Sequence, residues 1–113
     1  MQLTVETINN VAVATPHLRE FDASNAEDFK RQMAPVLQTN PRVVLDLSKV
    51  DFIDSSGCGA ILSCLKALAT VGGDLKLCQV VPRVRRTFEL IRLHKICEIY
   101  PTREETVASF SPK

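Results

Sequence analysis

Alternating apolar and polar positions predict that the chain begins with two β-strands. Residues 3–8 alternate in this way, and residues 11–15 are rich in β-branched side chains, a pattern typical of half-buried strands. Asn9 and Asn10 separate the two segments, and asparagine tolerates the positive φ of a two-residue turn. We therefore expect an N-terminal β-hairpin whose second strand ends at Pro16.

The next apolar residues recur at the spacing of an α-helix. They are Ala26, Phe29, Met33, Val36 and Leu37. This spacing predicts a helix over residues 24–37, and Ser24 followed by Glu27 fits a capping box at its start. Pro35 is expected to kink this helix or to shorten it by a turn.

Residues 42–47 form a nearly continuous apolar run, the pattern of a strand buried on both faces. Because this strand follows a helix, a crossover and a parallel pairing are expected. A second helix is predicted from Gly57 to Val71, ended by a glycine C-cap at Gly72 and Gly73. Its only polar stripe is Ser63, Lys66 and Thr70.

The C-terminal third continues the alternation of strands and helices. We expect a strand over 75–81, a helix beginning at Pro82, a short strand over 96–100 and a final helix beginning at Thr102, where Glu105 completes a second capping box. The inward face of the helix at Pro82 is predicted to be Val84, Phe88 and Ile91.

This order of elements predicts an α/β fold in one domain spanning residues 1–113. The predicted architecture is a single four- to five-stranded mixed sheet with an N-terminal β-hairpin and about four helices packed against it. Functional loops of such sheets gather at the carboxyl ends of the strands, where the turn at residues 54–57 lies.

Composition narrows the range of partners. The chain has 14 basic and 13 acidic residues, a net charge of +1, so it carries no strong field to attract nucleic acid or an anionic membrane. A run of basic residues over 83–95 is interpreted as a solvated helix face. The sequence contains neither a signal peptide nor a membrane-spanning apolar run, so we expect a cytoplasmic protein without membrane insertion.

The cysteines do not predict a metal or redox site. Their spacing matches no zinc or Cys-x-x-Cys pattern, and all are surrounded by apolar residues, so reduced, packed thiols are expected. They are Cys58, Cys64, Cys78 and Cys97. We expect neither a metal nor a cofactor.

The candidate chemistry lies in Asp54-Ser55-Ser56-Gly57, at a strand-to-helix transition. A phosphoryl group on Ser56 would bring about −1.5 to −2 charges to the positive end of a helix dipole, which the fold could tolerate. It would turn a neutral docking surface into an acidic one. Four such residues are also ordinary helix-capping chemistry, so the alternative is that Ser56 is only a cap.

The run from Val44 to Leu62, VLDLSKVDFIDSSGCGAIL, resembles the bacterial anti-sigma factor antagonists of the STAS domain family. The likeness also covers the opening hairpin, the turn at Asp22, Gly72-Gly73 and the run from Pro82 to Phe88. The resemblance implies a protein that, unphosphorylated, binds an anti-sigma factor with serine kinase activity and so releases a sigma factor. It also implies that phosphorylation of the second serine of the motif switches the protein off and that a serine phosphatase reverses this.

Carried onto this sequence, the resemblance makes Ser56 the phosphoacceptor, with Ser55 the weaker candidate. The implied partner-binding residues are Asp22, Asp54, Ser55, Ser56, Gly57, Cys58 and Leu62. Cys58 stands where the family more often has a larger aliphatic residue.

Helical spacing divides the second helix into two apolar sides. Cys58, Leu62 and Ala69 form a flank next to the polar stripe, and the best-buried line is expected to be Ile61, Leu65 and Leu68. The flank either contacts a partner or is covered by a neighbouring helix.

Two other functions are kept as alternatives. One is an unswitched STAS adaptor or scaffold subunit of a transport or signalling complex. The other is an enzyme that uses Ser56 as a nucleophile. Such a serine needs a base, and the only histidines, His17 and His94, stand in no recognisable triad context.

Overall fold

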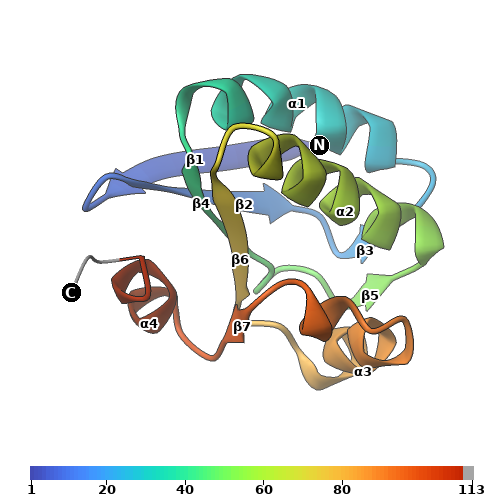
Figure 1. Cartoon of the computed structure of the whole chain (residues 1–113). Helices are drawn as coiled ribbons and strands as arrows, with labels where there is room; N and C mark the ends of the chain where they lie inside the picture. The colour runs from blue at the N-terminus through green and yellow to red at the C-terminus, as the bar shows by residue number, and fades with distance from the viewer. Residues whose placement is uncertain (111–113) are drawn as a thin grey trace.

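A mixed five-stranded sheet forms the centre of the molecule in a computed structural model that describes residues 1–110 (Figure 1). The strands lie in the order β1-β2-β4-β6-β7. Only β1 and β2 pair antiparallel; all other neighbours are parallel. The bounds are Gln2–Ile8 for β1, Val11–His17 for β2, Arg42–Asp46 for β4, Asp74–Cys78 for β6 and Ile99–Tyr100 for β7.

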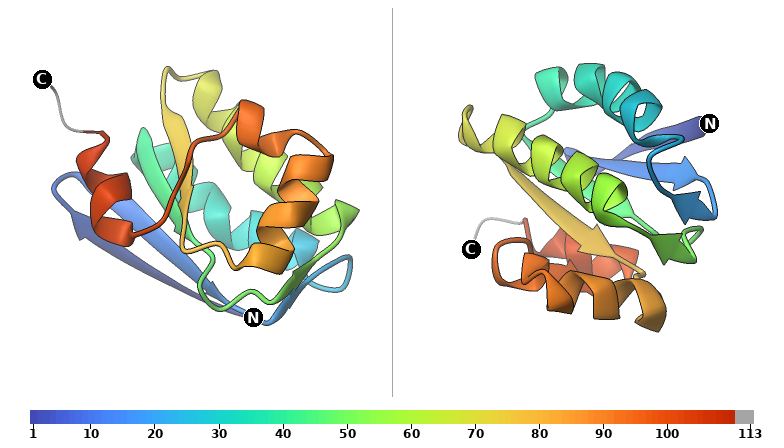
Figure 2. Two further views of the ribbon diagram at one scale, coloured as in Figure 1. Left: turned by 90° about the horizontal axis from the view of Figure 1, so that it is seen from below. Right: turned by 90° about the vertical axis from the view of Figure 1, so that its right-hand side faces the viewer.

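Helices cover both faces of this sheet. α1 and α2 lie side by side over one face, α4 covers part of the other, and α3 packs at the end of the sheet (Figures 1 and 2). The bounds are Ala26–Thr39 for α1, Ser55–Ala69 for α2, Pro82–Leu90 for α3 and Arg103–Ala108 for α4, with a 3₁₀ turn at Leu93–Lys95. The predicted α/β fold, a mixed sheet of four to five strands with an N-terminal hairpin and about four helices, is confirmed: residues 1–110 form a five-stranded sheet and four α-helices.

The opening hairpin forms as predicted. Asn9 and Asn10 have φ values of 52° and 66°, as a two-residue turn of type I′ requires. Pro16 does not end β2, which continues to His17. A proline is tolerated there because β2 pairs with β4 only at residues 12–14, so its missing N–H removes no hydrogen bond on that side.

The central strands separate two apolar clusters. Ala12, Ala14 and Leu45 face the large core under α1, α2 and α3. Val13 and Val44 face a smaller cluster that includes Val107 of α4. β4 is thus buried on both faces, as its continuous apolar run predicted.

The predicted capping box of α1 is wrong, and so is the predicted shortening at Pro35. The helix begins at Ala26, and no capping box forms because the Ser24 hydroxyl donates instead to Asp22 Oδ1 at 2.6 Å. Pro35 does not shorten the helix, which continues to Thr39. Pro35 and Arg31, the residue four positions earlier whose carbonyl loses its intrahelical donor, are both exposed, so water can solvate that carbonyl.

The C-terminal elements are shorter than predicted. Gln79 and Arg92 have φ values of 55° and 62°, and such left-handed residues end regular structure. β6 therefore ends at Cys78 and α3 at Leu90. Ile91 lies beyond the helix and is 49% exposed, so its predicted inward position is wrong. The Thr102 cap of α4 is present: its side chain accepts the Glu105 N–H at 3.1 Å.

A second, two-stranded parallel ribbon was not predicted. It pairs β3 (Glu20–Phe21) with β5 (Phe52–Ile53), Phe21 lying opposite Ile53. The ribbon directly precedes α2 and positions its first turn.

Candidate functional site

The ribbon brings two acidic residues from distant parts of the chain to one end. Phe21 and Ile53 are paired, so Asp22 and Asp54, the residues that follow them, leave the ribbon at the same end. The Asp54 N–H also donates to the Phe21 carbonyl at 3.2 Å. Two of the residues predicted for the site therefore share one rim, at the start of α2.

Asp54 is the N-cap of α2. Its Oδ1 accepts hydrogen bonds from the N–H groups of Ser56 at 2.8 Å and Gly57 at 3.0 Å, which satisfies two of the unpaired donors at the helix start. Among residues 1–110, the Ser56 side chain has no hydrogen-bond partner. The capping role that was the alternative for Ser56 thus belongs to Asp54, and the Ser56 hydroxyl is left available.

Gly57 sets how closely the ribbon approaches α2. A Cβ at this position would lie 2.4 Å from the Phe21 carbonyl oxygen and 2.7 Å from Ile53 Cγ1. At Gly59 a Cβ would meet no atom within 4 Å. Gly57 is therefore required by packing against both strands, and its buried position makes it a support of the site more than a contact surface.

Asp22 organises the loop on the other side of the rim. Its Oδ1 accepts from the Ser24 N–H at 3.0 Å and from the Ser24 hydroxyl, while its carbonyl accepts from the N–H groups of Asn25 and Ala26. The Asn25 side chain closes the loop by donating to the Glu20 carbonyl at 2.7 Å. The Asp22 carboxylate is thereby fixed beside the start of α1.

A shallow hollow of about 420 Å³ lies between the first turns of α1 and α2, and Ser56 lines it. On the α1 side it is lined by Glu27 and Lys30, whose Nζ lies 2.5 Å from Glu27 Oε2. Sequence reasoning missed Lys30. Its spacing of three residues from Glu27 predicts a surface ion pair, but only the packing of α1 against α2 places that pair on the same hollow as Ser56.

The structure corrects the two sides predicted for α2. Cys58 is 3% exposed, so it lies inside the protein and not on an open flank. Burial, with a further contribution from the charge of Asp54, raises the pKa of its thiol to about 11, which keeps it protonated. Leu62 is half-buried and Ala69 exposed, whereas Leu65 is only half-buried and Cys64 takes the expected place of Leu65 in the core.

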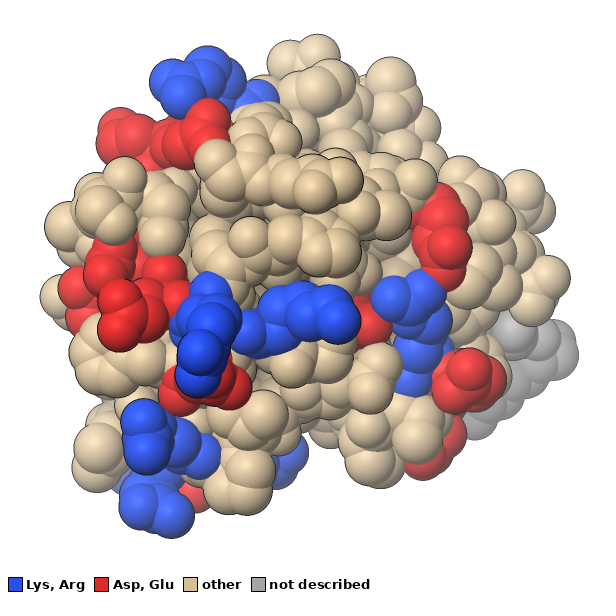
Figure 3. Space-filling view, turned by 180° about the vertical axis from the view of Figure 1, so that it is seen from behind, with Lys and Arg blue, Asp and Glu red and all other residues tan. Residues whose placement is uncertain are grey.

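Surface charge is mixed around the molecule. On the face in Figure 3, acidic and basic side chains alternate with wide uncharged areas, and neither sign dominates. This agrees with a net charge of +1. A single added phosphoryl group would thus change the local charge strongly.

Within residues 1–110, no group of three or more His, Cys, Asp or Glu side chains is arranged to hold a metal ion. Over the same range, no helix is long and apolar enough to span a membrane.

Comparison with known proteins assigns the family. A model of the STAS domain matches residues 2–106. The BtrV protein of Bordetella bronchiseptica is 33% identical, the match covering 97% of this chain and 95% of its relative. The anti-sigma F factor antagonist of Paenibacillus polymyxa is 33% identical over 88% of each chain.

Solved structures give the same result. The crystal structure of an anti-sigma factor antagonist from Mycobacterium paratuberculosis superposes with a TM-score of 0.86 at 25% identity, covering 96% of this chain and 92% of that one. Since the family model covers nearly all of the described residues, the chain belongs to the STAS domain family.

Proposed function

We propose that this protein is an anti-sigma factor antagonist of the cytoplasm, switched by phosphorylation of Ser56. The observation that carries the proposal is the hydroxyl of Ser56, which is half-buried at the start of α2 and without a hydrogen-bond partner among residues 1–110 because the Asp54 carboxylate caps the helix. The names of the similar proteins, anti-sigma factor antagonists, support the choice of partner.

The modification is a phosphoryl transfer from ATP. The Ser56 oxygen forms a bond to the γ-phosphorus while the bond to the β-γ bridging oxygen breaks, ADP leaves, and the hydroxyl proton passes to a base of the kinase. The chain itself supplies only the acceptor. Among the described residues that line the hollow around Ser56 there is no histidine to act as a base, which favours a substrate of a kinase over a serine enzyme.

Phosphorylation changes the surface more than the fold. About two negative charges are added at the positive end of the α2 dipole, so the helix is not destabilised. The same charges lie near the rim formed by Asp22 and Asp54, and together they make an acidic surface. A partner that docks on the unmodified, less acidic surface would be repelled.

The proposed docking surface is the exposed part of the predicted set. Ser55 is exposed, and Asp22, Asp54, Ser56 and Leu62 are half-buried, so all five can reach a partner. Gly57 and Cys58 are buried and act by shaping the surface. The partner is an anti-sigma factor with serine kinase activity, and a serine phosphatase would restore the unmodified form.

Intact mass spectrometry tests the switch. The protein is incubated with ATP and a lysate of the source bacterium, or with the kinase once it is identified. The mass of the unaltered protein is expected to rise by one phosphoryl group, whereas the Ser56→Ala protein should show no rise.

The matched control is Ser55→Ala, which removes the neighbouring exposed hydroxyl and should be phosphorylated as fully as the unaltered chain. Modification that survives in Ser56→Ala but is lost in Ser55→Ala would place the switch at Ser55. No modification of any variant by the isolated cognate anti-sigma factor would favour the unswitched adaptor.

A further inference from the structure

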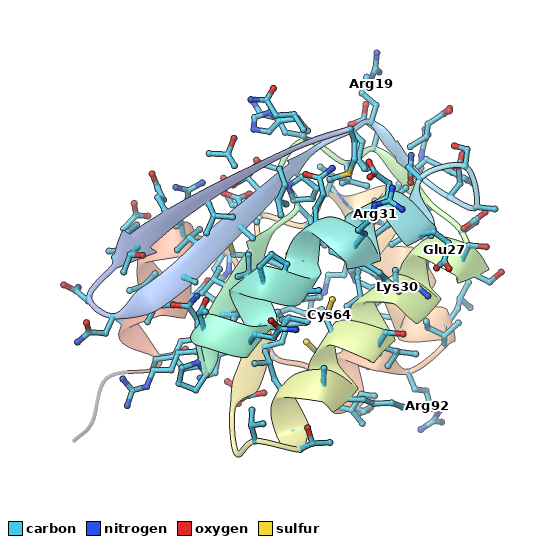
Figure 4. All side chains as sticks on the ribbon, turned by 90° about the horizontal axis from the view of Figure 1, so that it is seen from above. Arg19, Glu27, Lys30, Arg31, Cys64 and Arg92 are labelled. Carbon is cyan, nitrogen blue, oxygen red and sulfur yellow. The ribbon has the colours of Figure 1, made fainter. Side chains whose placement is uncertain are left out.

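Helix α1 presents one lysine to the hollow that Ser56 lines. Lys30 and Glu27 line this hollow together with the first turns of α2. Figure 4 shows both side chains on the side of α1 next to α2, whereas Arg31 extends from the other side of α1. Arg31 pairs with Asp28, which also holds the N-terminal ammonium group.

The ammonium group of Lys30 lies near α2 as well as near Glu27. Its charge opposes the rise in the pKa of the Cys64 thiol, which burial raises to about 12. Lys30 lines one hollow together with Ser56, Gly59 and Ala60 of α2, so the lysine side chain lies at the boundary between the two helices. Lys30 is therefore the cation of α1 that reaches α2.

The ion pair between Lys30 and Glu27 in the unmodified protein is weak. The Glu27 side chain is 78% exposed and that of Lys30 41%, and exposed ion pairs contribute only about 0.2–1 kcal/mol to stability. A phosphoryl group carries about twice the charge of a carboxylate and has three strong acceptor oxygens. A phosphoryl group on Ser56 would therefore compete well for the Lys30 ammonium.

We infer that the hollow between α1 and α2 is an intramolecular phosphate-binding site, in which Lys30 leaves Glu27 and pairs with the phosphoryl group on Ser56. This inference rests on the proposed function, because it describes how the modified serine is held. The new pair joins α1 to α2 only in the phosphorylated form. It also leaves the Glu27 carboxylate unpaired, while Lys30 offsets one charge of the phosphoryl group, so the exchange moves negative charge to Glu27 without changing the total charge.

The test uses phosphoserine placed at position 56 during translation, so that no kinase is needed. The pKa of the phosphoryl group, about 6 when unperturbed, is measured by phosphorus NMR as pH is varied. An ion pair favours the dianion, so the pKa in the otherwise unaltered protein is expected to lie below that of the Lys30→Met protein by about 0.5.

Two further variants separate a specific pair from a general charge effect. Arg31→Met also removes one positive charge, from the adjacent residue, and is expected to leave the pKa of the phosphoryl group unchanged. Lys30→Arg keeps a cation and is expected to keep the low pKa. Equal pKa values in the unaltered and Lys30→Met proteins, or equal rises in Lys30→Met and Arg31→Met, would overturn the inference.

The phosphorus NMR titration and the kinase experiment test separate claims. Unchanged titration in Lys30→Met overturns the role of Lys30 but leaves phosphorylation of Ser56 standing. Failure of the cognate kinase to modify Ser56 overturns the proposed function, whatever the titration shows.

Discussion

The molecule places charge differently in two regions, at the start of α2 and beneath α4. At the start of α2, the carboxylates of Asp22 and Asp54 are half-buried and receive hydrogen bonds from main-chain N–H groups of their own turns. Beneath α4, Asp46 and Lys76 extend from the central strands and are 1% and 7% exposed. The first region can accept added charge, whereas the second needs the charges it has.

Charged side chains connect the sheet to α4 in the region beneath this helix. Asp46 Oδ2 accepts from Nη2 of Arg103 at 2.8 Å and from its Nε at 3.1 Å. Lys76 Nζ donates to the Ser109 hydroxyl at 2.9 Å and lies 4.2 Å from the centre of the Phe110 ring. These contacts attach the C-terminal helix to the sheet, on the face opposite α1 and α2.

In this fold, the charges that support stability lie apart from the proposed phosphorylation site. A buried charge that loses its partner destabilises the protein, so a reversible charge change is tolerated only where solvent and free N–H groups accommodate it. The start of α2 meets this condition and the underside of α4 does not.

The largest expected effect comes from removing Arg103. Arg103→Met leaves the Asp46 carboxylate buried without its cation, which costs about 3–5 kcal/mol of unfolding free energy. Urea denaturation measures the loss. Arg85→Met is the matched control, because the Arg85–Glu89 pair is exposed, and it should change stability by less than about 0.5 kcal/mol. Equal losses of unfolding free energy in Arg103→Met and Arg85→Met would contradict the conclusion that the buried ion pair beneath α4 supports stability.

Acid should weaken the same pair. Burial acts to raise the pKa of Asp46, but Arg103 and the Ser48 N–H outweigh it and hold the pKa below its usual value of 3.8. A carboxyl whose pKa is lowered by folding stabilises the protein above its unfolded pKa, and this stability is lost as pH falls through the folded pKa. The urea concentration at the unfolding midpoint should therefore decrease as the pH is lowered below about 4. In Asp46→Asn this decrease should be less steep.

Two glycine substitutions near the start of α2 test how the β3–β5 ribbon packs against this helix. Gly57→Ala forces a Cβ against the Phe21 carbonyl, and we expect a loss of about 1–3 kcal/mol. Gly59→Ala meets open space and should stabilise the helix by about 0.5–1 kcal/mol. Thermal denaturation of both proteins checks the opposite signs; two changes of the same sign would contradict the close approach of the ribbon.

A smaller loss is expected from the cap of α2. Asp54→Ala removes the acceptor for the Ser56 and Gly57 N–H groups and should cost about 1 kcal/mol. Asp54→Asn keeps an acceptor oxygen and should cost less. Urea denaturation distinguishes them, and equal losses would show that the charge of Asp54, more than its hydrogen bonds, supports the helix.

Regular elements were predictable from the sequence because their signals are local. The Asn9-Asn10 turn, the apolar run of β4 and the left-handed Gly72, with φ of 75°, after α2 each follow from the residues present. The β3–β5 ribbon was missed because two-residue strands have no periodicity. The Ser24 cap was predicted wrongly because Asp22, two positions earlier, binds the same hydroxyl.

The site was only partly predictable for the same reason. The turn at Asp54–Gly57 and its link to Asp22 follow from a motif that resembles a known family. Which side of α2 is open depends on how the neighbouring helices pack, so the sequence left two alternatives for the flank of Cys58, and the structure shows Cys58 buried. The position of Lys30 beside Ser56 depends on the crossing of α1 and α2, which no local pattern encodes.

In the proposed switch, one phosphoryl group on Ser56 changes binding and not folding. The most direct test is calorimetric titration of the anti-sigma partner with the unmodified protein and with protein carrying phosphoserine at position 56. We predict that the modified protein binds at least about tenfold more weakly, while its urea midpoint stays within the error of the unmodified one. Equal affinities for the two forms would contradict the account.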